Sequence, residues 1–145
     1  MPPLTKGRET ARREGDFRDE ALAAAQTVFT GGIIMRQADG YLVNGATAVG
    51  LIGCGVVYGD VDNATGASGD AMVSYRRGCF RFANSTGADE VLANHIGALA
   101  YVVDDQTVAA TDGAATRSPA GIIEGVDALG VWVRFDEALT SAFIG

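Results

Sequence analysis

The side chains that could do catalytic chemistry are few, and no motif surrounds them. His95 is the only histidine, so any Ser/His or Cys/His catalytic pair must include it. The sequence contains no G-x-S-x-G nucleophile elbow. Asp104 and Asp105 are adjacent carboxylates, but neighbouring strand-end residues point to opposite sides and aspartate is common in turns. We therefore expect that this chain is not an enzyme.

Metal and phosphate sites are also predicted to be absent. The segment 60–63 (DVDN) resembles the start of a calcium loop, but Thr65 stands where the loop needs glycine and the closing glutamate is missing. The glycine-rich segment 50–55 lacks the Lys-Ser/Thr pair and the following helix of a phosphate loop. Cys54, Cys79 and the one histidine are too far apart in the sequence to indicate a zinc site. We expect no cofactor and no metal.

The two cysteines occur in apolar, strand-like runs. This setting predicts that Cys54 and Cys79 are buried thiols, and it leaves a disulfide between them open, because sequence alone does not give their separation.

Cationic and aromatic side chains remain as candidates for binding. Arg76 and Arg77 could hold a carboxylate or a phosphate, or could be ion-pair partners within the protein or between subunits. Trp132 alternates with Val131 and Val133 in a strand-like run, and the valines make the better core face together with Phe135. Trp132 is therefore predicted to face outward or into an interface, where aromatic rings anchor contacts.

Charge is distributed unevenly along the 145 residues. Residues 1–20 carry five basic and five acidic groups, whereas the remaining 125 residues carry six arginines against thirteen acids, which gives a net charge of −7. An acidic body repels phosphates, so we expect no nucleic-acid partner. No apolar run is long enough to span a bilayer and no signal-peptide core is present, so we expect no membrane partner and synthesis in the cytoplasm.

Turn signals in the sequence indicate where the strands that carry the candidate residues begin and end. Short β-branched runs alternate with Asp/Gly turns over residues 98–135, and these short turns predict antiparallel neighbours. Twenty glycines, about twice the usual share, suit many turns and bulges. Residues 37–40 (QADG) are a hairpin signal, and Gly50, Gly53 and Gly55 indicate strong curvature or close packing of another backbone. Strands are expected over 48–61 and 71–83, and one or two helical turns over 90–96.

These patterns predict an all-β fold: a small antiparallel β-barrel or sandwich-like body with one short helix. Residues 1–20 are polar and densely charged, so we expect an extended arm that becomes ordered against a partner, followed by a single body domain over residues 21–145. The tail after Phe135 is expected to be a last partial strand or a docking segment.

Three phrases of the sequence carry a family resemblance: residues 75–85 (YRRGCFRFANS), 100–109 (AYVVDDQTVA) and 111–122 (TDGAATRSPAGI). They resemble the capsid cement, or head decoration, proteins of Mu-like and related tailed phages and prophages, over roughly residues 15–135. The resemblance implies a structural β-barrel on the outer capsid surface of the virion, which bridges neighbouring subunits of the major capsid protein. It also implies a homodimer or homotrimer, strand-like structure over residues 16–29, and no catalytic residues.

Contact residues follow from this expectation. Arg8, Arg12 and Arg13 could pair with an acidic capsid surface, or could merely solvate a disordered tail. Trp132 is a candidate for a capsid or intersubunit contact. Two other classes stay open: a β-barrel component elsewhere in the virion (tail tube, head–tail joining or fibre base) and a glycan-binding module.

Overall fold

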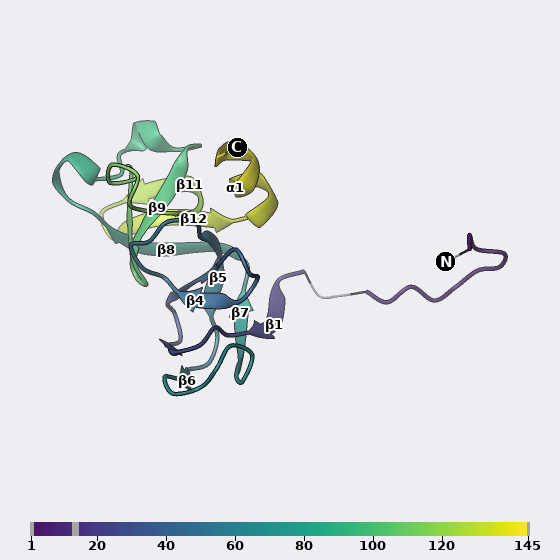
Figure 1. Ribbon diagram of the computed structural model, residues 1–145. Helices are drawn as coiled ribbons and strands as arrows, with labels where there is room; N and C mark the ends of the chain where they lie inside the picture. Colours follow the sequence, from purple (N-terminus) through teal and green to yellow (C-terminus); the bar gives the residue numbers. More distant parts are fainter. Residues whose placement is uncertain (1, 13–14, 145) are drawn as a thin grey trace.

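Twelve β-strands and one α-helix make up the described part of the chain, residues 2–12 and 15–144, in the computed structural model (Figure 1). The strands are β1 (Phe17–Ala21), β2 (Gln26–Val28), β3 (Ile33–Arg36), β4 (Leu42–Asn44), β5 (Ile52–Val57), β6 (Val61–Asn63), β7 (Met72–Arg76), β8 (Gly78–Asn84), β9 (Leu99–Asp104), β10 (Thr107–Ala109), β11 (Pro119–Asp127) and β12 (Gly130–Phe135). The helix is α1 (Glu137–Ile144). The fold is all-β, as predicted, and its one short α-helix lies at the C-terminus and not over residues 90–96.

The first half of the chain forms an antiparallel sheet in the order β1-β7-β5-β3-β4. Its two edges meet just after β1, where Leu22 bridges Leu42 of β4 and the Ala23 N–H donates to the Leu42 carbonyl at 2.8 Å. The sheet is therefore curled almost into a barrel. Its interior is a cluster of buried apolar side chains: Leu22, Val28, Ile34, Leu42, Cys54, Val57, Val73 and Tyr75.

The second half forms a closed barrel in the order β10-β8-β12-β11-β9. The consecutive pairs β9–β10 and β11–β12 are antiparallel, as the short turns predict. One pairing lies outside the segment to which the short-turn prediction applied: β10 runs parallel to β8, with Thr107 opposite Ala83. The barrel closes through this pairing, which joins segments distant in the sequence.

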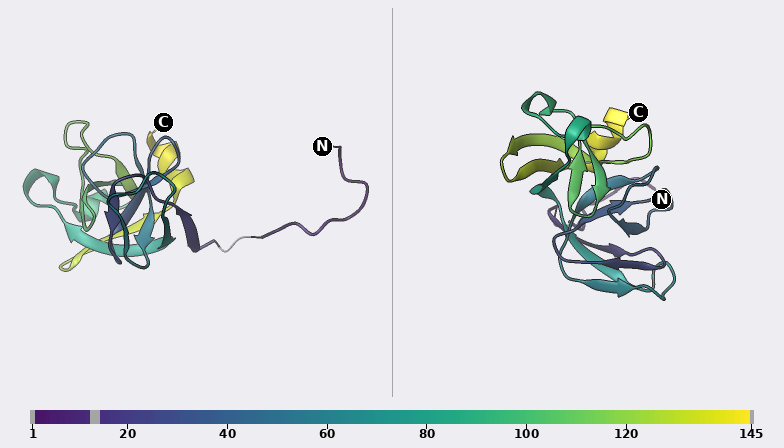
Figure 2. Two further views of the ribbon diagram at one scale, coloured as in Figure 1. Left: turned by 60° about the horizontal axis from the view of Figure 1, so that its bottom comes forward. Right: turned by 90° about the vertical axis from the view of Figure 1, so that its left-hand side faces the viewer.

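One apolar core joins the sheet to the barrel, which lies above it in the right-hand view of Figure 2. Ile33 and Met35 of β3 belong to the same buried cluster as Val102 and Ile123 of the barrel. The backbones approach most closely at Gly53 of β5, where an added Cβ would overlap the backbone of Ala120 in β11. The close packing predicted from the glycine spacing is confirmed there.

Local signals are confirmed in two further places. Residues 37–40 form the β3–β4 hairpin, in which the Gln37 N–H donates to the Tyr41 carbonyl at 3.0 Å and Gly40 has a φ of +92°. Val131, Val133 and Phe135 of β12 are buried, whereas Trp132 and Arg134 face outward.

The C-terminal tail is a helix, and the expectation of a last partial strand is wrong. Asp136 is the N-cap, since its carboxylate accepts the Leu139 N–H at 3.0 Å and its carbonyl accepts the Thr140 N–H at 2.9 Å. The helical turns expected over 90–96 are instead two single 3-10 turns, at Gly87–Asp89 and Ala93–His95.

Three predicted boundaries also shift. The strand β1 begins at Phe17, so the last residues of the predicted 1–20 arm belong to the sheet. The strand expected over 48–61 divides into β5 and β6, and the one expected over 71–83 divides at Arg77 into β7 and β8.

We predict that Gly53→Ala lowers the free energy of unfolding by about 1–3 kcal/mol, because the added methyl group forces β5 away from β11. Urea denaturation measures this change. Gly125→Ala is the matched control, since a Cβ there has only ordinary contact with Trp132 at 3.6 Å, and it should change stability by less than about 0.5 kcal/mol. Equal effects of the two variants would contradict the interpretation.

Candidate interaction surface

The N-terminal arm extends away from the body and contains neither a helix nor a β-strand in residues 2–12 (Figure 1). All of residues 2–12 are exposed, and they form no hydrogen bond or ion pair with any other described residue. Arg8 and Arg12 lie on this segment with their side chains in solvent, and Arg13 lies outside the described residues. The cations of the arm that the structure describes therefore lie in solvent and not against the body.

An ion-pair network ties β1, the strand that follows the arm, to the rest of the body. Arg36 of β3 donates from Nη2 to Glu20 of β1 at 2.9 Å, and from Nε to Glu137 of α1 at 2.9 Å. The Tyr75 hydroxyl of β7 donates to the same Glu20 carboxylate. One guanidinium thus ties the first strand, the sheet and the C-terminal helix together.

The protonation states of this network follow from its contacts. Hydrogen bonds to Glu137 and Glu20 raise the pKa of Arg36, so the guanidinium stays charged. Burial raises the pKa of Tyr75, and the hydrogen bond to Glu20 adds to this effect, so the phenol stays a donor. Cys54 lies beneath the network, and burial raises the pKa of its thiol.

Both cysteines are free, so the disulfide left open by the sequence does not form. Cys54 is buried as expected, whereas the prediction that Cys79 is buried is wrong. Cys79 alternates with Phe80 and Phe82 along β8 and shares the outward face with Arg81.

Aromatic and cationic side chains gather at the root of the arm. The rings of Phe17 and Tyr58 meet edge to face at 5.4 Å, and the Arg76 guanidinium lies 5.3 Å from the Tyr58 ring centre. A neighbouring concavity of about 430 Å³, which we call the root pocket, is lined by Asp16, Phe17, Arg76, Arg77 and Phe80.

Neither arginine of the root pocket has a carboxylate partner within residues 2–12 and 15–144. Arg76 is exposed and Arg77 is half-buried, and neither forms an ion pair with any described residue. The sequence allowed Arg76 and Arg77 either to form ion pairs within the chain or to bind a carboxylate or phosphate from outside it. The described residues contain no such ion pair, so the second role remains.

A second aromatic surface lies on the barrel around Trp132, which is 37% exposed on β12. Its indole N–H donates to Asp127 at 3.0 Å, and the Arg81 guanidinium lies 5.5 Å from the ring centre. The hydrogen bond from Trp132 lowers the pKa of Asp127. Leu129, in the adjoining turn, is 73% exposed. Trp132 therefore faces outward as predicted, with its ring held in one orientation.

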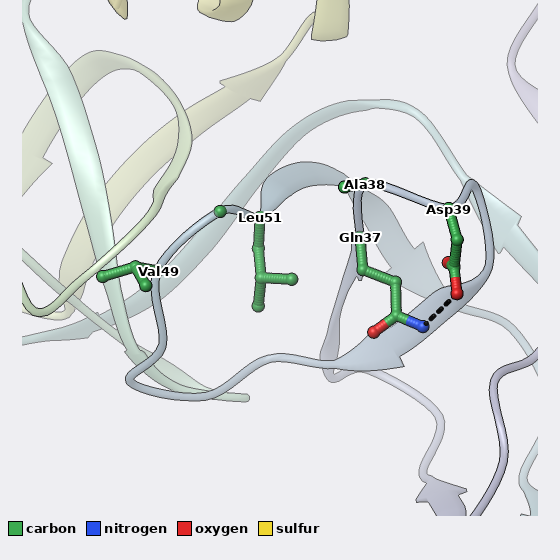
Figure 3. Close-up of a pocket in the computed structure, with 6 residues that line it drawn as sticks. Gln37, Ala38, Asp39, Val49 and Leu51 are labelled. Carbon is green, nitrogen blue, oxygen red and sulfur yellow. Dashed lines mark hydrogen bonds between the residues drawn. The ribbon is translucent and has the colours of Figure 1, made fainter.

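Figure 3 shows another concavity, of about 380 Å³, beside the β3–β4 hairpin. Its labelled lining residues are Gln37, Ala38, Asp39, Val49 and Leu51, and the Gln37 amide donates to Asp39 at 3.2 Å. This lining has one carboxylate and no nucleophile–base pair, so it offers no arrangement for acyl or phosphoryl transfer.

The residues weighed as catalytic or metal-binding have structural partners. The His95 ring accepts the Leu92 N–H at 2.8 Å within a 3-10 turn. Asp104 accepts the Gln106 N–H at 2.9 Å and so serves the turn, whereas Asp105 accepts the Asn44 amide of β4 at 3.2 Å. Asp60 accepts two hydrogen bonds from Thr30, which lower its pKa.

Residues 2–12 and 15–144 contain neither a cluster of metal ligands nor a membrane-spanning helix. No three His, Cys, Asp or Glu side chains in this part lie together as a metal site would require. No helix in this part is long and apolar enough to cross a membrane.

The candidate residues thus fall on separate surfaces: Arg8 and Arg12 on the arm, and Trp132 on the barrel. The cluster of Phe17, Tyr58 and Arg76 was missed by sequence reasoning, because three separate segments meet only in the folded sheet. Comparisons with protein-family models, with curated proteins and with solved structures find no match to this chain.

We predict that Arg36→Ala lowers the free energy of unfolding by about 2 kcal/mol, because it leaves the partly buried carboxylates of Glu20 and Glu137 without their cation. Thermal or urea unfolding measures the change. Arg134→Ala, which removes an exposed pair with Glu124, should cost less than about 0.5 kcal/mol. A smaller effect of Arg36→Ala than of this control would contradict the role of the network.

We predict that acid changes the fluorescence of Trp132, the only tryptophan, in a step centred below about pH 3.9, the ordinary aspartate pKa. The folded-state pKa of Asp127 is lowered, so its stabilisation of the ring is present above that pH and is lost as the pH falls through the folded pKa. Asp127→Asn keeps an acceptor that does not titrate and should abolish the step. Circular dichroism separates the step from acid unfolding. A step that persists in Asp127→Asn would assign it to another group.

Proposed function

We propose that this protein is a capsid decoration, or cement, protein of a tailed phage. It binds the outer surface of the phage head and bridges neighbouring subunits of the major capsid protein, and its role is mechanical instead of catalytic. The observation that carries the proposal is the exposed arm, residues 2–12, which projects from a closely packed all-β body and forms no hydrogen bond or ion pair with any other described residue. The three sequence phrases that resemble this family support it.

The arm supports a binding role because its composition suits ordering on a surface. Lys6, Arg8 and Arg12 carry positive charge, and Glu9 carries the opposing charge in this segment. Ordering such a chain has an entropic penalty, which a large contact area can offset. Many copies on one shell would add avidity, since each bound arm restricts its body to the neighbourhood of further sites.

The body supports a mechanical role because it is rigid and anchors the arm firmly. The closed barrel and the curled sheet share one core, and the network around Arg36 holds β1 at the arm root. Force on the arm would therefore pass into paired strands.

The number of copies in a virion would distinguish a cement protein from other β-barrel components of the virion. A cement protein follows the hundreds of shell subunits, whereas a tail-tube, head–tail joining or fibre-base protein is present in far fewer copies than the shell subunits. A glycan-binding module would instead show affinity in a glycan screen and none for heads.

We predict that deletion of residues 1–14 leaves the body folded but lowers its occupancy on expanded heads of the same phage by at least about tenfold. The cut falls before β1, and the Asp16 carbonyl that accepts the Arg77 N–H at 2.8 Å is retained. Co-sedimentation with heads measures occupancy, and circular dichroism checks the fold.

Arg8→Gln/Arg12→Gln in the full-length chain tests the charge of the arm separately and should reduce occupancy in part. Unchanged occupancy of the deletion variant would show that the arm does not grip the shell, and absence of binding by the wild type would overturn the proposed function.

A further inference from the structure

The barrel carries a hollow beside Trp132 that the proposed arm contact does not use. Its volume is about 430 Å³, which is within the range of small-ligand pockets. The end of β8, the loop after it and the β11–β12 turn line the hollow, through residues 83–86, Glu90 and residues 127–130. We call the hollow together with the Trp132 ring the barrel-end site.

The register of two strands places the hollow next to the tryptophan. Trp132 of β12 is paired with Arg81 of β8, and both residues are exposed on the outer face of the barrel. Ala83 and Gly130 lie two residues further along the same two strands, so they belong to the same face. Neither has a side chain larger than a methyl group, which leaves space beside the indole ring.

Asp127 connects the ring to the hollow. Its carboxylate accepts the indole N–H of Trp132 at 3.0 Å, and the same residue lines the hollow. It also accepts the N–H groups of Leu129 and Gly130, at 2.8 and 3.1 Å, which holds the carboxylate in the turn. The ring is therefore fixed in one orientation, and a ligand does not have to order it.

The polar groups of the hollow that have no partner suit hydroxyl groups. The side-chain hydroxyls of Ser85 and Thr86 form no hydrogen bond within residues 2–12 and 15–144, and Glu90 is exposed and forms no ion pair in that part of the chain. A hydroxyl both donates and accepts, whereas a carboxylate accepts. A sugar offers several hydroxyls on one small ring, and each of them can donate to one group and accept from another.

We propose that the barrel-end site binds a neutral glycan through one pyranose ring. The C–H face of a pyranose is apolar and packs on the exposed part of the Trp132 ring, while the hydroxyls at its rim reach Glu90 and the free side-chain hydroxyls beside it. This activity is additional to head binding and does not depend on it.

The charges around the site favour a neutral ligand. Glu90 and Asp127 both line the hollow, so an anion would be repelled there. The Arg81 guanidinium lies 5.5 Å from the centre of the Trp132 ring, so a second cation on this ring would be repelled as well. A sugar without charge avoids both repulsions.

The barrel-end site lies away from the arm. The segment 85–97, which supplies three of its polar side chains, is on the opposite side of the body from the arm in Figure 1 and in the left-hand view of Figure 2. The arm and the barrel-end site can therefore be occupied at the same time.

The fluorescence of Trp132, the only tryptophan in the chain, tests the proposal directly. The wild type is titrated with glucose, galactose, mannose, N-acetylglucosamine and lactose, and saturation-transfer NMR on each sugar gives a second readout. At least one of these sugars should cause a saturable change, with a dissociation constant of about 10 mM or lower. Trilysine peptide, titrated in parallel, should cause none.

Glu90→Ala should raise the dissociation constant of that sugar at least about tenfold, because a hydrogen bond to a charged group is lost. Glu9→Ala is the matched control, since it removes the same side chain from the exposed arm and should leave sugar binding unchanged. Trp132→Ala should abolish the saturation-transfer signal, and circular dichroism checks its fold. If Trp132→Ala does not fold, the two glutamate variants still decide the outcome.

Four results would overturn the proposal: no binding of any of the five sugars, a Glu90→Ala variant that binds as the wild type does, equal losses in the two glutamate variants, or a response to trilysine alone, which would assign the site to a cation. No heads are present in these measurements, so failure here is separate from failure of the proposed function. A protein that binds a sugar but no heads would support this inference and overturn the proposed function.

Discussion

The contact of Arg36 with two carboxylates is the interaction on which the arrangement of the surface depends. Glu20, Arg36 and Glu137 come from β1, β3 and α1, which lie far apart in the sequence. A guanidinium can serve both carboxylates at once because its N–H groups point in fixed directions within one plane. Arg36 therefore ties the first strand and the C-terminal helix to the same point of β3.

A second constraint acts inside the body. The sheet and the barrel can share a core only if β5 and β11 approach closely, and glycine at position 53 allows that approach. In the proposed function, the body would fix where the arm begins, and the arm would bind the shell surface nearby. The acidic body and the two arginines at the arm root place opposite charges on one molecule.

Sequence reasoning found the features that depend on near neighbours. The hairpin over 37–40 and the burial of Val131 and Val133 were predictable, because turn chemistry and a period of two are local signals. The parallel pairing of β10 with β8 was not, since it joins strands that lie apart in the sequence. The α1 helix was missed because only eight residues form it, and its stability comes from Asp136 and Arg36.

The sequence predicted which way single residues of the candidate surface face, but it did not predict which of these residues contact one another. The alternation that places Trp132 outward is visible in the sequence, whereas its contacts with Asp127 and Arg81 require the folded barrel. The same alternation could have placed Cys79 outward, because it shares the period of Arg81. The ring contact of Phe17 with Tyr58 joins β1 to the chain after β5, and no local pattern encodes it.

The meeting of the two sheet edges at Leu22 and Leu42 has a consequence for crowding. Unpaired strand edges are templates for cross-β growth, and they are most hazardous where many identical chains lie side by side. A sheet curled on itself and a barrel closed by β8 and β10 leave little of this backbone available. Copies packed densely on a lattice would thus contact one another through side chains, whose charge and shape can be selective. They would not associate through main-chain hydrogen bonds between strand edges.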